Sequence, residues 1–170
     1  SSTENTCWIC RGTMFLHQHH IIHRYLKPGN VLLDSNLHPH IIDFGCPKFY
    51  EIGKDPSTTS NLGALFYMAP ESIFGNKYSE KSDVYSFECL MFEVVTDQEL
   101  YPELKNLNSI QIMPKMASHQ IQKPEFKNHV KKTIEDLIKR CWSDDPDKRP
   151  TFEELFHKLS HNSEEWITDN

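Results

Sequence analysis

The residues best suited to chemistry lie at positions 23–34, which read His-Arg-Tyr-Leu-Lys-Pro-Gly-Asn-Val-Leu-Leu-Asp. Basic side chains and an amide stand close together in this stretch. Asp43-Phe44-Gly45 follows it, and Ala69-Pro70-Glu71 comes after a further polar segment. Basic groups suit phosphates, whereas amide and carboxylate oxygens suit hard cations such as magnesium. Residues of these types could therefore handle phosphate groups together with a metal ion.

The stretch resembles the catalytic loop of a protein kinase, whose pattern is His-Arg-Asp-Leu-x-x-x-Asn. Four of the five specified residues are in register, and the position of the catalytic base holds Tyr25. The two triplets are the next motifs of that family, in the same order. Any one motif alone is weak evidence, but all three in order are a strong signal. The resemblance covers about residues 5–160, and Lys27 and the ending Gly-x-x-x-Tyr-Met-Ala-Pro-Glu look like serine/threonine kinases of the tyrosine-kinase-like group.

The resemblance implies roles in nucleotide chemistry, which depends mostly on positioning and charge neutralisation. Asn30 and Asp43 match the positions that hold magnesium with ATP, and Lys27 matches the one that neutralises the moving phosphate. Arg24 matches a residue that pairs with a phosphate on the activation loop in many kinases. Asn30 and Asp43 are alternatively structural remnants that close turns. The candidate phosphate acceptors, alternatively no more than a flexible loop, are Ser57, Thr58, Thr59 and Ser60.

Three further matches imply structural roles. Glu71 is expected to form a buried ion pair with Arg149, and Asp83 to accept hydrogen bonds from the backbone of the catalytic loop. These roles support the fold without arguing for activity.

The departures from the family pattern cluster where activity lies. Tyr25 replaces the base; a phenol has a pKa near 10, so it is a poorly matched base at neutral pH. Ala64 stands where the family usually has a threonine that bonds the base and the lysine. Glu88 stands where a small residue is expected in a buried helix, and a buried unpaired charge is costly.

The nucleotide-binding part of the family pattern is absent from this sequence. A kinase holds ATP with a glycine-rich loop and a strand lysine. Only 22 residues precede His23, the first lysine is Lys27, and no Gly-x-Gly-x-x-Gly occurs. We therefore expect a mainly α fold, the C-terminal lobe with a small β-hairpin at the catalytic loop and without the N-terminal lobe. Residues 1–162 form this lobe and residues 163–170 a polar tail.

Apolar periodicity predicts the helices. Residues 1–22 read as a polar cap and a helix, with Cys7, Cys10, Met14, Trp8 and Phe15 on one apolar face. Residues 82–96 are apolar almost all round, which indicates a buried helix. A short helix is expected near 110–116 and the clearest amphipathic helix at 130–141. The last helix begins at a capping box that its sequence predicts between Thr151 and Glu154.

The form Cys-x-x-Cys at residues 7–10, with His17, His20 and His23 downstream, allows a zinc or redox interpretation. The spacing from Cys10 to His17 is too short for a common zinc finger, and both cysteines fall on the apolar face of the helix. Core packing is the preferred interpretation, and the histidine cluster is read as a solvated helix end.

Composition excludes several classes of protein. The net charge of −6 argues against a broad nucleic-acid surface. No apolar run approaches the ~18 residues of a membrane span. Five scattered cysteines argue against a disulfide framework, so we expect a reducing, cytoplasmic location.

Two main functions remain open. The first is an inactive pseudokinase that acts in signalling as a protein-interaction module. The second is the C-terminal part of a serine/threonine kinase that transfers the ATP γ-phosphate to protein hydroxyls. A decaying gene copy is a third interpretation. Protein partners are expected, and so is self-association through the apolar face that would meet an N-terminal lobe.

Overall fold

The computed structural model describes residues 2–24, 26–44, 63–74, 77–126 and 130–161. Its helices are α1 (Ser2–Gln18), α3 (Pro70–Ile73), α4 (Glu80–Thr96), α5 (Ser109–Ala117), α6 (Lys132–Cys141) and α7 (Phe152–His161). Short 3-10 turns are η1 (Pro28–Asn30), η2 (Pro102–Leu104) and η3 (Pro146–Lys148). The strands are β1 (Val31–Leu33) and β2 (Pro39–Ile41). The expected mainly α fold with one hairpin is confirmed.

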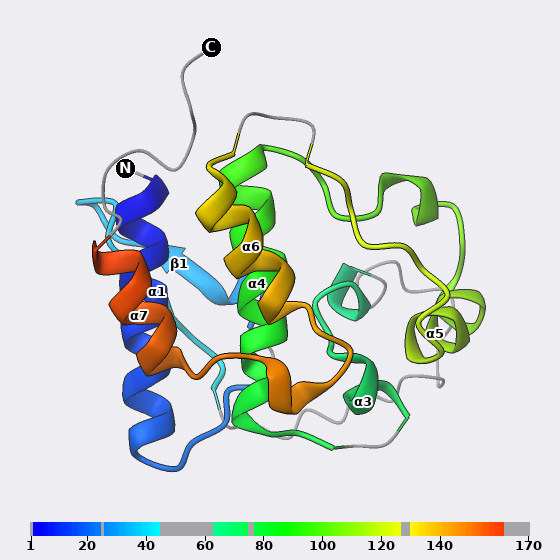
Figure 1. The fold of residues 1–170 in the computed structure, drawn as a ribbon, viewed down its shortest axis with the longest axis horizontal. Helices are drawn as coiled ribbons and strands as arrows, with labels where there is room; N and C mark the ends of the chain where they lie inside the picture. The colour runs from blue at the N-terminus through cyan, green and yellow to red at the C-terminus, as the bar shows by residue number, and fades with distance from the viewer. Residues whose placement is uncertain (1, 25, 45–62, 75–76, 127–129, 162–170) are drawn as a thin grey trace.

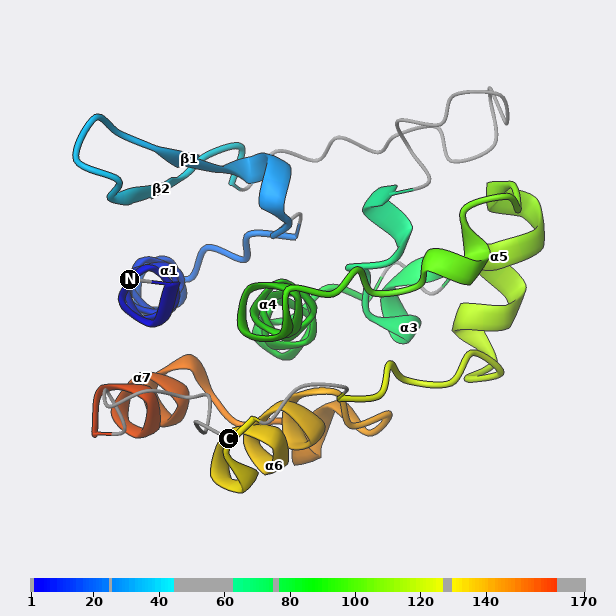
Figure 2. The same cartoon turned by 90° about the horizontal axis from the view of Figure 1, so that it is seen from above.

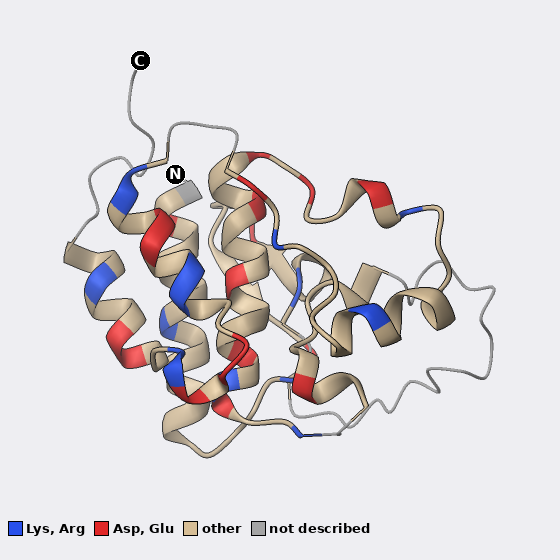
Figure 3. Ribbon diagram, turned by 45° about the vertical axis from the view of Figure 1, so that its right-hand side comes forward, with Lys and Arg blue, Asp and Glu red and all other residues tan. Residues whose placement is uncertain are grey.

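Helix α4 runs through the middle of the molecule, with α1 and α7 on one side and α3 and α5 on the other (Figure 1). Helix α6 lies along α4, and the hairpin and α7 cover opposite sides of α1 (Figure 2). Basic and acidic residues are interspersed along the described elements (Figure 3). None of the helices in these ranges is long and apolar enough to cross a membrane.

The hairpin is held by its turn and by its contact with α1. Strands β1 and β2 are antiparallel, with Val31 opposite Ile41. The Asp34 carboxylate accepts hydrogen bonds from the backbone nitrogens of Asn36 (2.8 Å) and His38 (3.0 Å), which is the turn chemistry expected of aspartate. Gly12 lets β2 approach, because a Cβ there would lie 3.0 Å from Ile41 Cδ1. The hairpin therefore rests on the helix rather than standing free in solvent.

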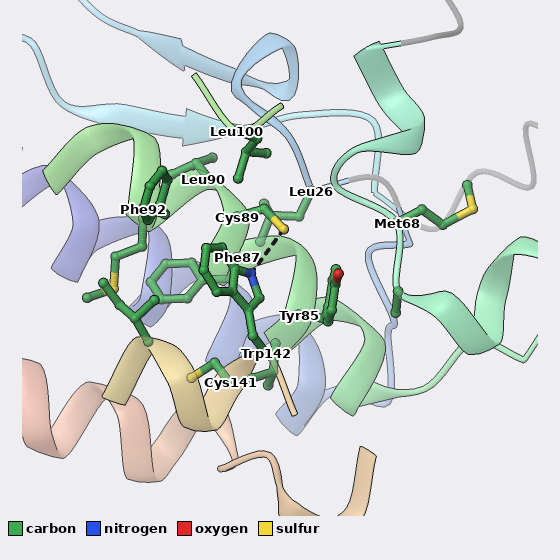
Figure 4. Close-up of a cluster of buried hydrophobic side chains, with 14 of the residues drawn as sticks. Leu26, Met68, Tyr85, Phe87, Cys89, Leu90, Phe92, Leu100, Cys141 and Trp142 are labelled. Carbon is green, nitrogen blue, oxygen red and sulfur yellow. Dashed lines mark hydrogen bonds between the residues drawn. The ribbon is translucent and has the colours of Figure 1, made fainter. Parts of the chain in front are cut away.

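The buried helix expected at 82–96 is the centre of the core. Its aromatic residues pack against neighbouring rings: Phe87 meets Phe152 edge-on with centroids 5.3 Å apart, and Phe92 lies tilted against Trp142, also at 5.3 Å. Trp142 reaches from the end of α6 and donates to the Cys89 sulfur at 3.3 Å (Figure 4). These contacts tie α6 and α7 to α4.

The predicted apolar face of the first helix is partly wrong. Cys10 is fully buried, but Trp8 and Phe15 are 46% and 57% exposed. The buried face instead includes Thr6 and Thr13. Thr13 can be buried because its hydroxyl donates to the Ile9 carbonyl at 3.0 Å, so no polar group is left unsatisfied.

The other helices follow their predicted patterns. The capping box is present: Glu154 N donates to the Thr151 hydroxyl (3.2 Å), and Thr151 N donates to Glu154 Oε2 (3.0 Å). The short helix near 110–116 is α5. Val130 lies outside α6, although the expected apolar residues of that helix are buried: Ile134, Leu137, Ile138 and Cys141.

Glu88 is an acidic residue in the middle of α4 whose side chain lies inside the core. It is fully buried, as expected, and within the described ranges neither carboxyl oxygen has a hydrogen-bond partner. Burial raises its pKa from 4.5 to about 8, and the neighbouring Cys141 thiol, a weak donor, only slightly opposes this rise. The folded protein therefore keeps the Glu88 carboxyl protonated at neutral pH.

Glu88 predicts a specific loss of stability in alkali. Folding raises the pKa of Glu88, so the folded state binds this proton more tightly than the unfolded state. The contribution to the free energy of unfolding is fully present below pH 4.5 and is lost as the pH rises toward 8. The loss is on the order of 4 kcal/mol at ~1.36 kcal/mol per pKa unit. Glu88→Gln keeps the shape but does not titrate, so urea unfolding at pH 5 and pH 8 should show a much smaller fall than in the parent. Equal falls in both proteins would contradict this, since other groups titrate alike in the two.

Candidate functional site

The Asp83 carboxylate holds the start of the catalytic-loop stretch. It lies in the first turn of α4 and is fully buried. Oδ2 accepts from the His23 backbone nitrogen at 2.7 Å, and Oδ1 accepts from the Arg24 nitrogen at 2.8 Å. The predicted contact between Asp83 and the loop backbone is therefore present. Charge-assisted bonds of this kind are shorter and stronger than neutral ones.

The conformation at Arg24 explains why such an anchor is needed. Its φ is 74°, in the left-handed region that a side chain with a Cβ rarely adopts. The backbone nitrogens of His23 and Arg24 both donate to Asp83, so the chain is held immediately before this bend. The Arg24 guanidinium then lies 5.7 Å from the centre of the Tyr78 ring.

His17 completes the environment of Asp83, and the sequence interpretation missed it. Its Nε2 is 2.7 Å from Asp83 Oδ2, and its ring meets Phe152 edge-on at 5.0 Å. The expectation of a solvated histidine cluster is wrong for His17 and His23, which are buried, whereas His20 is exposed. The signal that could have found His17 is its spacing: it lies four after Thr13 and seven after Cys10, on the buried face of α1.

The hairpin brings Asn30 and Asp43 to one place. The Ile42 nitrogen donates to the Asn30 carbonyl at 3.0 Å, so the residue after Ile42 lies beside η1. The buried His23 ring is 3.1 Å, through Nε2, from the Ile42 carbonyl, which ties the loop to the same point. Burial lowers the pKa of His23, so its neutral form, donating through Nε2, suits this contact.

The donor set at this place fits magnesium. Asn30 supplies an amide oxygen, Asp43 an exposed carboxylate, and both are hard oxygen ligands of the kind this ion prefers. Proteins bind magnesium through one or two such groups together with substrate phosphates and water. Among the described residues there is no group of three or more His, Cys, Asp or Glu that could hold a metal by itself.

Lys27 and Ala64 face one shallow hollow with Arg24. The same hollow is lined by Tyr67, Met68 and Ser86. Ala64 has no hydroxyl to offer a loop residue here. Tyr25 and the candidate acceptors 57–60 lie outside the described residues, as do the expected tail 163–170 and Gly45.

The expected ion pair of Glu71 and Arg149 is present and is bidentate. Arg149 donates from both terminal nitrogens to Glu71, at 2.7 and 3.0 Å, and it is 1% exposed. Its Nε and Nη1 also donate to the carbonyls of Ser143 (2.9 Å) and Lys81 (3.0 Å). A buried guanidinium that donates four hydrogen bonds, two of them to one carboxylate, is the arrangement in which such a pair is tolerated.

Residues 3–159 match the family model described as the protein kinase domain. The chain belongs to the protein kinase family. It is 35% identical over 144 residues to RGS domain-containing serine/threonine-protein kinase A of Dictyostelium discoideum, covering 85% of this chain and 12% of that one. It is 33% identical to dual specificity protein kinases shkA (152 residues; 87% and 28%) and shkB (144 residues; 85% and 22%) of the same organism. The chain thus spans less than a third of each relative.

The kinase assignment agrees with the fold, because the three motifs and the mainly helical architecture are those of the C-terminal lobe. Kinases of this family use ATP and magnesium in general. The kinase C-lobe seen here holds its loop through Asp83 and its Ala-Pro-Glu segment through Arg149. Both anchors are buried.

Removing one acceptor from Asp83 should release the loop. Asp83→Asn keeps the size of the side chain but replaces one carboxylate oxygen by an NH₂ group. This NH₂ donor then faces a backbone N–H of His23 or Arg24, so one hydrogen bond is lost. We expect a loss on the order of 2–3 kcal/mol in urea unfolding, with faster amide exchange at His23 and Arg24. Asp97→Asn is the matched control, because Asp97 is the exposed C-cap of α4 at φ 54° and asparagine adopts that conformation equally well. Equal stability and equal protection in the two variants would show that the anchor is unimportant.

Proposed function

We propose that this kinase-like chain is a protein-interaction module that performs no phosphotransfer. The observation that carries the proposal is Tyr25 at the position of the catalytic base. A phenol stays protonated at neutral pH, and it is larger than the carboxylate that the family has at this position. Loss of a general base typically lowers the rate ~10²–10⁴-fold.

The rest of the site supports a maintained scaffold. The loop anchor at Asp83 and the Glu71–Arg149 pair are intact, whereas Tyr25 and Ala64 change positions that serve catalysis. The residues that anchor the fold are retained, and the two changed positions serve the reaction. A module that presents a surface needs the former and not the latter.

The hairpin offers the surface on which such a module could bind a protein. Four apolar side chains in and after the hairpin are each between 46% and 65% exposed: Leu32, Leu33, Leu37 and Phe44. Contiguous exposed apolar residues mark protein contacts, and these four belong to the hairpin and the segment that follows it. A signalling role in the cytoplasm, protein partners and self-association through this side remain part of the proposal.

A second candidate function is phosphoryl transfer by a longer kinase that contains this chain. It is favoured by the retention of Asn30, Asp43 and Lys27, since the Asn30 backbone bonds to Ile42, which precedes Asp43, and to Lys27. Asn30 and Asp43 would hold magnesium, which supplies charge neutralisation for the phosphates of bound ATP. Lys27 would place its ammonium near the transferred group.

The first proposal predicts no transfer by the purified chain. Incubation with labelled ATP, magnesium and a general protein substrate should give counts equal to those of Asp43→Ala. Asp43 is exposed but its φ is 58°, a conformation that costs alanine roughly 1–2 kcal/mol, so far-UV circular dichroism must show that this variant is folded. Transfer by the parent that disappears in Asp43→Ala would overturn the proposal.

The second candidate predicts a gain on restoring the base. In a fusion of this chain to the ATP-binding lobe of a related kinase, Tyr25→Asp should raise the transfer rate ~10²–10⁴-fold. Tyr25→Phe is the matched control, because it removes the phenol oxygen without supplying a carboxylate. If aspartate gives no more than phenylalanine does, other changes such as Ala64 limit the chain and the enzyme interpretation fails.

A further inference from the structure

A hollow lies between α1 and α7, which run antiparallel and side by side (Figure 1). Its volume is ≈ 440 Å³, within the ~300–1,000 Å³ that ligand pockets typically measure. Side chains of both helices form its wall, among them Glu4, Cys7, Trp8, Arg11, Phe156 and Ser160. None of these residues belongs to the kinase motifs discussed above.

Two aromatic rings give the hollow an apolar wall that solvent reaches. Trp8 is 46% exposed, although the opposite face of the same helix is buried. Phe156, from α7, is partly buried and packs against the core. An indole exposed to this extent leaves apolar area in water, and a second apolar group placed on it would remove that area from water. The hollow is therefore suited to an aromatic or aliphatic side chain.

Arg11 gives the same hollow a positive charge without a partner. Its guanidinium carbon lies 5.8 Å from the centre of the Trp8 ring, and among the residues that the structure describes it forms no hydrogen bond or ion pair. A guanidinium with free donors suits a carboxylate, which it binds through two parallel hydrogen bonds. Glu4 also lines the hollow, but it stands seven residues before Arg11, about 10 Å along the helix. An acidic group is therefore favoured at the Arg11 end.

The sequence that follows α7 carries groups complementary to this wall. Helix α7 ends at His161, one residue after Ser160, which lines the hollow. Residues 162–170, which lie outside the described ranges, read Asn-Ser-Glu-Glu-Trp-Ile-Thr-Asp-Asn, so they hold three carboxylates, no lysine or arginine, and one apolar pair. Trp166 is five positions beyond His161, and five residues of extended chain span about 17 Å. Its indole can therefore reach the hollow from the end of α7.

We propose that residues 164–167 fold back into this hollow. Trp166 lies against the rings of Trp8 and Phe156, and the carboxylates of Glu164 and Glu165 meet the Arg11 guanidinium. An acidic segment is favoured over a basic one because the unpaired charge of the hollow is a cation. A segment joined to α7 by a few residues also has a high effective concentration, which favours it over a separate molecule with the same groups.

The docked segment would join α1 to α7 across the hollow and cover an aromatic surface that is otherwise exposed. The contact involves neither the catalytic loop nor the Asp83 anchor. The inference therefore concerns this hollow alone and does not depend on whether the chain transfers phosphate.

Cys7 can report whether the segment is docked. Its half-buried thiol lines the hollow, so a docked Trp166 covers it. The whole chain is treated with N-ethylmaleimide, and labelling of each cysteine is followed by peptide mass spectrometry. In Trp166→Ala the Cys7 rate should rise at least threefold, whereas Trp166→Phe, the matched control, keeps an aromatic ring and should change it little. Cys10 is fully buried and must stay unlabelled, which shows that the fold remains closed.

A charge exchange tests the contact with Arg11. Arg11→Glu alone, and Glu164→Arg with Glu165→Arg, should each raise the Cys7 rate, because each brings like charges together. Adding the two arginines to the Arg11→Glu chain should instead lower the rate toward that of the parent. The same segment substitution then acts with opposite signs in two backgrounds. A direct effect of the new charges on the Cys7 thiol would have the same sign in both.

Three outcomes would overturn the proposal. A Cys7 rate that is unchanged in Trp166→Ala means that this segment does not cover the hollow, whether a small ligand, another protein or only solvent fills it. A rate that falls as the protein concentration rises means that the segment of a second copy fills it. Equal signs in the two backgrounds of the charge exchange mean that Arg11 does not hold the segment.

Discussion

The buried carboxylate of Asp83 is the constraint on which the site depends. An isolated carboxylate in a protein interior is strongly unfavourable, so its position is stable only with donors around it. Here the donors are two successive backbone amides of the loop, with the His17 ring at a third position. The same hydrogen bonds also constrain the elements that supply the donors. The loop is held at His23 and Arg24 because both backbone amides donate to Asp83, and α1 is joined to α4 because the His17 ring contacts Asp83 Oδ2.

One helix distributes its acidic residues over several tasks. Asp83 in the first turn of α4 holds the loop, and Glu88 in the middle is enclosed in the core as a neutral acid. Near the end, Glu93 accepts from the Tyr67 hydroxyl at 2.5 Å and from the Leu100 nitrogen at 3.2 Å. The carboxyl groups near the two ends of the helix therefore accept hydrogen bonds from neighbouring donors, whereas burial raises the pKa of Glu88 between them to about 8.

The sequence predicted most of the fold and part of the site. The order of the motifs and the periodicity at 130–141 were sufficient for the architecture, because both depend on residues near one another in the chain. The role of Asp83 followed from the family pattern. His17 was missed because its partner lies 66 residues away, and its own neighbours in sequence suggested a solvated cluster. Trp8 and Phe15 were misplaced because helical spacing fixes only which residues share a face, and which face is buried depends on β2 and α7.

Lys123 is a second residue whose contacts the sequence does not predict. Its charge and the proline after it suggest an ordinary surface loop. In the folded chain its ammonium donates to the hydroxyl of Tyr85, which lies 38 positions earlier. Local patterns report helix faces and turns, whereas the chemistry of a titratable group is set by distant segments that pack around it.

The bonds of Arg149 have a consequence for how the molecule opens. Its guanidinium joins α3 through Glu71, the first turn of α4 through the Lys81 carbonyl and the segment after α6 through Ser143. None of these three segments can leave without exposing a charge that the other two hold in the interior. They therefore form one cooperative unit that detaches as a whole or not at all. A kinase lobe with an altered loop can in this way keep a sharply defined native state around the first turn of α4.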